Sequence, residues 1–189
     1  SEVRDDQQAL RSLFENVASA LFIVALAGFG FVLIAGEQLF AIVLGEQWQM
    51  AGMYARILAP FFLISFVSSP LSTLSLIYNR QKVGLLFSVI VTLLRIVSLL
   101  FSALANSPEL GVALYAITSF IVYLAYLVWA LHLAGMHFDR WLWNLRRFIA
   151  LNGLLIILGL AFPNPVFLIL IGICLAAVAL FYVRKVNFS

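Results

Sequence analysis

The sequence predicts an all-α integral membrane protein with six transmembrane helices, for three reasons. Hydrophobic residues make up 65% of the 189 residues and charged residues only 10%, whereas a soluble domain is about half apolar and about a quarter charged. Polar or proline-bearing breaks divide the chain into six apolar runs, and a helix that crosses a bilayer needs about 20 such residues. Lysine and arginine also collect at every second break.

The six candidate spans follow one another with short breaks between them. They are residues 17–35, 50–78, 83–105, 111–136, 147–162 and 166–183. The second contains Pro60 and Pro70, which predict a kinked or strongly tilted helix. The fifth is short, and a start nearer to Trp143 would lengthen it. The chain thus divides into a cytoplasmic arm (1–16), four helices (17–136), and a cytoplasmic loop followed by two further helices (137–189).

The cations predict that both ends of the chain are cytoplasmic, an N-in/C-in topology, because short cytoplasmic loops carry the excess of Lys and Arg. The stretches between, 36–49, 106–110 and 163–165, carry only the acidic charges Glu37, Glu46 and Glu109. Nine of the eleven cations lie in the arm, in the turn after the second span, in the loop after the fourth, and in the tail: Arg4, Arg11, Arg80, Lys82, Arg140, Arg146, Arg147, Arg184 and Lys185.

The two remaining cations, Arg56 and Arg95, fall inside predicted spans. At about 100° per residue, the small and polar residues of the third span share one third of the helix circumference with Arg95. A stripe of this kind cannot face lipid, where its polar groups would have no partners. We therefore expect it to face other helices or water. Its members are Gly84, Ser88, Thr92, Arg95, Ser98 and Ser102.

Arg95 lies near the middle of its span, where an arginine costs about 2.5–3.5 kcal/mol on insertion scales, and none of the eight acidic residues lies deep in a predicted span. Three interpretations stay open. Arg95 is a structural residue bonded to helix carbonyls or to an acid on another helix, a cavity contact for an anion such as phosphate, or a side chain that snorkels to the surface. Ser88, Thr92 and Ser98 join it as candidate substrate-binding residues.

Arg56 is the fifth candidate substrate-binding residue, although its place six residues into the second span favours a structural role. Snorkelling past Tyr54 to the outer surface is open to it. Four serines of the same span recur at three- and four-residue spacing, which favours close helix packing: Ser65, Ser68, Ser72 and Ser75.

The sequence shows no catalytic motif, and we expect no enzyme activity, no metal site and no cofactor. His132 and His137 are interpreted as interfacial residues, and Cys174 as a residue that packs in the core or against lipid. No basic cluster suggests a nucleic-acid partner. The chain starts at a serine without a signal-peptide pattern, and we expect it to be a fragment of a longer protein.

Residues 44–89 carry a resemblance to a known family. A Gly-Glu-x-Trp turn (45–48) precedes an Ala-Gly pair (51–52), and a long helix follows with a Ser-Pro-Leu-Ser element (69–72) and a Gln-Lys turn (81–82). The order of these features, preceded by the charged arm, resembles the polysaccharide-biosynthesis or O-antigen-type flippases of the multidrug/oligosaccharidyl-lipid/polysaccharide exporter superfamily. The resemblance covers about residues 1–136.

The resemblance implies a two-lobed fold of 12–14 helices around a cavity that opens to each side in turn, with this chain as the C-terminal half. It also implies a transporter that moves undecaprenyl-pyrophosphate-linked oligosaccharide across the bacterial inner membrane. Its partners would be that lipid-linked oligosaccharide, membrane lipids and the N-terminal lobe of the same chain. The family pattern does not itself mark Arg95 as a binding residue.

Two other functions stay open from the sequence. The chain could be a structural or assembly subunit of a membrane complex, with its polar stripes serving helix packing. It could also belong to a small-molecule exporter of the same superfamily, although an exporter of cations would favour acidic cavity residues, and the predicted spans contain none.

Overall fold

The structure, a computed structural model, describes residues 2–186, with side chains from Arg11 onward. Over this range it contains helices, short turns and no strand, and six helical segments are long and apolar enough to cross a membrane. This confirms the predicted all-α class and the prediction of six helices suited to cross a membrane. Ser1 and residues 187–189, the outer ends of the first and last predicted segments, lie outside the described residues.

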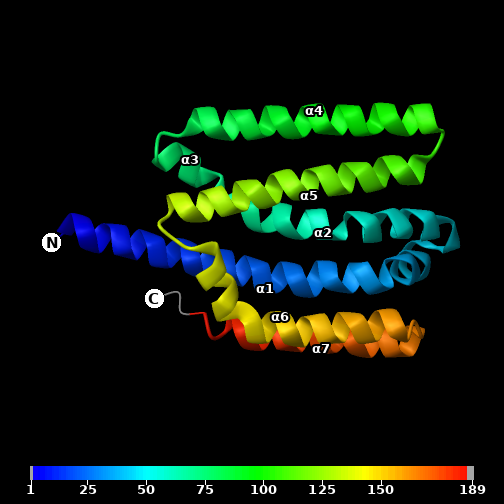
Figure 1. Ribbon diagram of the computed structural model, residues 1–189. Helices are drawn as coiled ribbons and strands as arrows, with labels where there is room; N and C mark the ends of the chain where they lie inside the picture. The colour runs from blue at the N-terminus through cyan, green and yellow to red at the C-terminus, as the bar shows by residue number, and fades with distance from the viewer. Residues whose placement is uncertain (1, 187–189) are drawn as a thin grey trace.

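Seven α-helices and one 3₁₀ turn make up the described chain (Figure 1). Ser107 caps the fifth α-helix and Asn164 the seventh through their side-chain oxygens, and each is followed by a proline at the first helical position, where the missing N–H costs nothing. The elements are α1 (Glu2–Leu44), η1 (Glu46–Trp48), α2 (Gln49–Leu71), α3 (Thr73–Ile77), α4 (Gln81–Ala105), α5 (Pro108–Leu133), α6 (Phe138–Ala161) and α7 (Pro165–Val183).

The first helix is longer than predicted, and the expectation that residues 36–44 belong to an outer loop is wrong. Helix α1 continues to Leu44 and stops where Gly45 takes a φ of 105°, a conformation that favours glycine. The apolar run 39–44 extends the helix beyond the polar residues at 36–38. Glu37 is therefore a helical residue that faces a neighbouring helix.

Helix α6, which corresponds to the fifth predicted span, starts earlier than predicted. It begins at Phe138, so the expected loop before residue 147 is largely helical. Its first turns cross α1 (Figure 1). There the buried Trp141 donates from Nε1 to Ser19 Oγ over 3.0 Å and packs edge-on against Phe22. Burial of this large ring holds the polar first turns of α6 in helical form.

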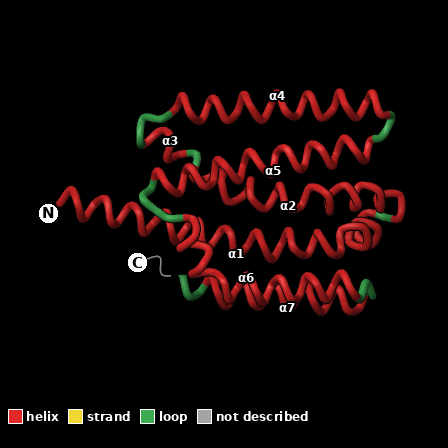
Figure 2. Tube along the Cα trace, viewed as in Figure 1, coloured by secondary structure: helices red, strands yellow, loops and turns green. Residues whose placement is uncertain are grey.

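The predicted irregularity of the second span falls at its second proline. Helix α2 passes Pro60 without a break and ends at Leu71, one residue after Pro70, and the short α3 leaves at an angle (Figure 2). Proline lacks an N–H and clashes with the carbonyl four residues earlier. The Ser72 hydroxyl donates to Ser69 O over 2.6 Å, and the Ser75 hydroxyl donates to Ser72 O over 2.7 Å.

The helices pack in the spatial order α4, α5, α2, α1 and then the pair α6–α7 (Figure 1). The apolar core joins α1, α2, α5, α6 and α7, with Leu71, Leu127 and Phe148 fully buried. Within the described chain, α5 is the one long helix whose backbone lies close to that of α4, although the Arg95 side chain reaches Phe61 of α2. The outward face of α4 is apolar and exposed, as in Leu85 and Leu104.

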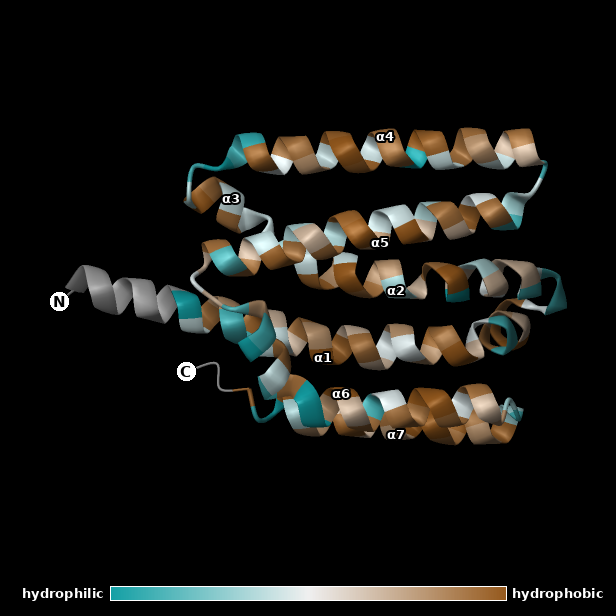
Figure 3. Cartoon of the chain, in the orientation of Figure 1, coloured by the Kyte–Doolittle hydropathy of each residue, from teal (hydrophilic) through white to brown (hydrophobic). Residues whose placement is uncertain are grey.

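Polar residues gather at the two ends of the bundle, and apolar residues fill the middle of the helices (Figure 3). The start of α1 and the end of α7 lie at one end of the bundle, together with the turn that joins α3 to α4 and the connection from α5 to α6 (Figure 1). We call this the cationic end, because Arg80, Lys82, Arg140 and Arg184 lie at it. That it faces the cytoplasm stays a prediction.

Candidate functional site

Arg95 lies in the middle of α4 and is half-buried against α5 and α2. Its Nε donates to Ser119 Oγ over 3.0 Å. Its Cζ lies 4.8 Å from the ring centroid of Tyr115, 5.4 Å from that of Phe61 and 5.9 Å from that of Tyr123. Such contacts between a cation and an aromatic face are worth about 0.5–2 kcal/mol each. We call these three rings and Ser119 the Arg95 box.

No carboxylate of the described residues neutralises Arg95. One ion pair occurs among the described residues, and it joins Arg56 to Glu37. Ser119 is the sole described side chain that accepts a hydrogen bond from Arg95. A guanidinium has five N–H donors in a planar fork and cannot lose its charge in a protein. The box thus holds the cation through one hydrogen bond and three rings, and leaves the charge without an opposite charge.

The polar stripe of α4 faces its neighbours along most of its length. Ser98 is buried, donates to Leu94 O over 2.8 Å and lies 3.4 Å from the Thr118 hydroxyl. Ser102 donates to Ser107 O over 2.9 Å. Thr92 differs, because it is exposed and its hydroxyl bonds back to Ser88 O over 2.8 Å. Among these candidates the structure brings Arg95 and Ser98 against α5 and leaves Thr92 outside that contact.

A cavity of about 500 Å³ lies between the α2–α3 break, α4 and α5. It is lined by five serines of α2 and α3 and their junction, by Gly84 and Ser88 of α4, and by two tyrosines of α5. The serine stripe, which the sequence predicted to serve packing, therefore also supplies hydroxyl groups to an open space. The serines and tyrosines are Ser65, Ser68, Ser69, Ser72, Ser75, Tyr123 and Tyr126.

The cavity lies next to the Arg95 box on the side of the cationic end. Its lining on α4 runs from Gln81 to Val91, one helical turn before Arg95. Tyr123 belongs to both, since it lines the cavity and contacts Arg95. The unneutralised cation and the hydroxyl-lined space therefore share one aromatic side chain.

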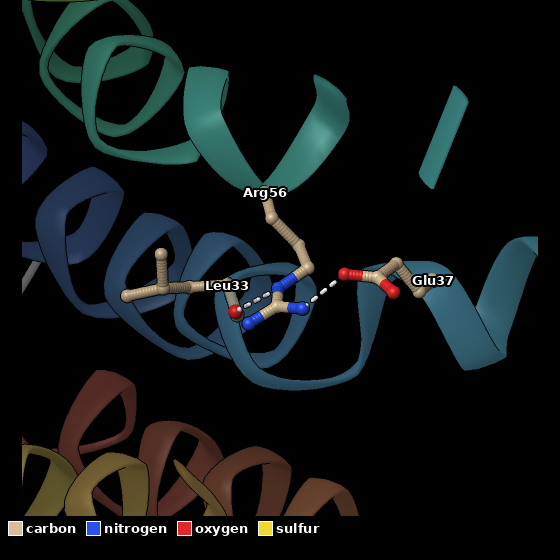
Figure 4. Close-up of polar contacts among 3 residues, drawn as sticks. All are labelled: Leu33, Glu37 and Arg56. Atoms are coloured by element: carbon tan, nitrogen blue, oxygen red, sulfur yellow. Dashed lines mark hydrogen bonds and ion pairs between the residues drawn. The ribbon is translucent and has the colours of Figure 1, made fainter. Parts of the chain in front are cut away.

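Arg56 lies elsewhere and has an acidic partner. Its Nη1 pairs with Glu37 Oε1, and its Nε donates to Leu33 O over 3.0 Å (Figure 4). Both partners belong to α1, whereas the serines of α2 face α4 and α5. The structure therefore does not bring Arg56 together with Arg95, and it places a counter-ion for Arg56 on a segment that the sequence assigned to a loop.

The residues that sequence reasoning missed are those of the Arg95 box. On α5 the box residues Tyr115, Ser119 and Tyr123 recur every four residues, a spacing that puts them on one face of a helix. That regular spacing of polar and aromatic residues could have indicated the face that meets Arg95. Phe61 carries no comparable signal, because it is one of several phenylalanines in an apolar run.

No group of three or more His, Cys, Asp or Glu side chains capable of holding a metal ion occurs among the residues that the structure describes. No protein-family model matches the chain, and no curated protein and no solved structure matches it either.

Proposed function

We propose that this chain is the C-terminal part of a flippase that moves undecaprenyl-pyrophosphate-linked oligosaccharide across the bacterial inner membrane. One observation carries the proposal. Arg95 lies in mid-span with no carboxylate among its described neighbours, beside a hydroxyl-lined cavity. The resemblance of residues 1–136 to such flippases adds to it.

The proposed chemistry follows from the guanidinium. A planar fork of donors binds two phosphate oxygens at once, and in a low-dielectric setting this attraction is much stronger than in water. Arg95 would lower the cost of bringing a pyrophosphate headgroup past the hydrocarbon layer. The serine and tyrosine hydroxyls would hydrogen-bond the sugars, while the polyprenyl tail stays in lipid.

In this proposal the cationic end faces the cytoplasm, in line with the bias of Lys and Arg. The N-terminal lobe of the same chain would close the cavity from the other side, since α4 leaves its apolar outer face exposed. Alternating access would then move the headgroup between cationic contacts of the two lobes.

The test uses the full-length protein in cells that depend on it for surface glycan. Loss of a hydrogen bond to a charged group is worth about 1.5–3 kcal/mol, so Arg95→Ala should lower glycan export at least about tenfold. Arg95→Lys should retain part of the export, because it keeps the charge and loses the fork. The control is Arg184→Ala, which removes an exposed cation at the end of the bundle.

Normal export by Arg95→Ala, at an unchanged amount of inserted protein, would refute the proposal. A second function, a structural subunit of a membrane complex, is favoured by the three aromatic contacts of Arg95. In that event Arg95→Ala would lower the amount of folded protein, and Arg95→Lys would restore it without any separate effect on export.

A further inference from the structure

A second groove, between α5 and the start of α6, combines an apolar wall with two imidazoles. Its volume is about 650 Å³. The wall includes Leu124, Val128 and Trp129 of α5, and the end nearest the α5–α6 connection carries His132 and His137. None of its lining residues belongs to the Arg95 box or to the serine-lined cavity.

We propose that this groove binds one anionic membrane phospholipid, with an acyl chain along the wall and the phosphate between the two imidazoles. The wall lies on a helix that is long and apolar enough to span the bilayer. His132 lies in the last turn of that helix, and His137 precedes the first turn of α6. A phospholipid has the same order of groups, a hydrocarbon chain followed by a phosphate at the interface.

The two imidazoles are placed to share one headgroup. Their ring centroids are 6.3 Å apart and both side chains are exposed. An imidazole offers one N–H donor when neutral and two donors with a positive charge when protonated. Donors from both rings can therefore reach oxygens of a single phosphate, and neither ring is the donor in a hydrogen bond to another described side chain.

The charge around the groove complements an anion. Helix α6 begins beside it without a side-chain cap, and the first N–H groups of a helix carry a positive partial charge. Its first turn contains Arg140 and also one opposing charge, Asp139. Basic pockets between transmembrane helices are a common binding site for anionic lipid headgroups.

The experiment measures lipids retained by the purified full-length protein in native mass spectrometry. The probes are phosphatidylglycerol and phosphatidylcholine with identical acyl chains. We expect the protein to retain more phosphatidylglycerol than phosphatidylcholine. We expect His132→Phe and His137→Phe to lower phosphatidylglycerol retention about fivefold each, because each removes a hydrogen bond worth about 1 kcal/mol. Phenylalanine keeps a ring on the wall and removes the N–H donors.

A groove-filling variant makes the test independent of the imidazoles. Ala125 lines the groove and is exposed, so Ala125→Trp should abolish retention of the lipid. Ile173→Trp, on the exposed face of α7 and outside both cavities, is the matched control and should retain it.

Three results would overturn the proposal: equal retention of the two lipids, wild-type retention by Ala125→Trp, or displacement of the lipid by millimolar inorganic phosphate, which would indicate a site for the free anion. Because the readout is binding, failure of the transport proposal leaves the result of this test unchanged.

Discussion

The two arginines within the membrane-spanning helices have opposite surroundings. Arg56 has a carboxylate, Glu37, and a backbone carbonyl, Leu33 O, and its side chain is 33% exposed. Arg95 has a serine hydroxyl and three aromatic faces. The first is neutralised within the chain, and the second keeps a net charge for which the described residues supply no partner.

This difference separates a structural cation from a candidate binding cation. An arginine that already pairs with an acid would lose that contact on binding an anion. An arginine that rests on aromatic rings and a serine hydroxyl has no opposite charge to give up, so a phosphate would bring it an attraction that its present contacts do not supply. The comparison therefore predicts that changes around Arg56 affect stability and that changes at Arg95 itself affect transport.

The largest expected effect comes from Gly52, where α2 meets α1 next to the Arg56 pair. A Cβ at Gly52 would contact Gly36 O and lie 2.8 Å from the Cα of Glu37, both of them backbone atoms. Gly52→Ala would therefore force the two helices apart and separate Arg56 from Glu37. We expect the free energy of unfolding to fall by about 3 kcal/mol or more, as measured by SDS-induced unfolding in mixed micelles.

Gly28→Ala on α1 is the matched control, because a Cβ there meets nothing within 4 Å. It should leave the free energy of unfolding unchanged or raise it by up to about 1 kcal/mol through helix propensity. Equal effects of the two substitutions would show that α1 and α2 do not approach closely at Gly52.

The next effect concerns the ion pair itself. Glu37→Gln leaves Arg56 without an opposite charge, although the amide oxygen can still accept a hydrogen bond and the bond to Leu33 O stays. Breaking a fully buried pair costs about 3–5 kcal/mol, whereas exposed pairs contribute about 0–1 kcal/mol. Because both partners are about one third exposed, we expect a loss of about 2 kcal/mol in the same unfolding measurement.

A charge exchange sharpens this prediction. The double variant Glu37→Arg with Arg56→Glu should recover part of the stability that either single change loses, which a double-mutant cycle measures as a coupling energy. Glu109→Gln is the control, because Glu109 accepts a hydrogen bond from Ser107 and forms no ion pair with a described cation. A coupling energy near zero would show that Glu37 does not neutralise Arg56, and the two arginines would then not differ.

The sequence predicted the membrane class and six spans because hydropathy and length are local properties. It also predicted that the stripe of α4 faces other helices or water, and Ser98 and Arg95 do contact α5. It missed the partner of Arg56, because Glu37 follows a glycine and precedes a glutamine in what looked like a loop. Only the packing of α1 against α2 shows that the helix continues and brings the carboxylate to the arginine.

The Arg95 box could not be predicted because it is a property of three helices at once. Phe61 comes from α2, Arg95 from α4, and Tyr115, Ser119 and Tyr123 from α5. The spatial order of the helices places α5 between α4 and α2. A stripe on one helix indicates which side faces a neighbour, but it does not indicate which neighbour.

The smallest expected effect is that of Ser119→Ala, which removes the hydrogen bond accepted from Arg95. A hydrogen bond to a charged group contributes about 1.5–3 kcal/mol. Arg95 is only half-buried and keeps its three ring contacts, so part of this contribution is recovered when the freed N–H turns to water. We expect a loss of about 1 kcal/mol or less in SDS unfolding, with glycan export by the full-length protein maintained.

Thr92→Val is the control for that measurement, because the Thr92 hydroxyl bonds only to Ser88 O of its own helix. It should change the free energy of unfolding by no more than a few tenths of a kcal/mol. If Ser119→Ala destabilised the protein as much as Glu37→Gln, Arg95 would be held as firmly as Arg56. The contrast between a neutralised and an available cation would then fail, because the guanidinium could not leave its box for a phosphate without a comparable loss.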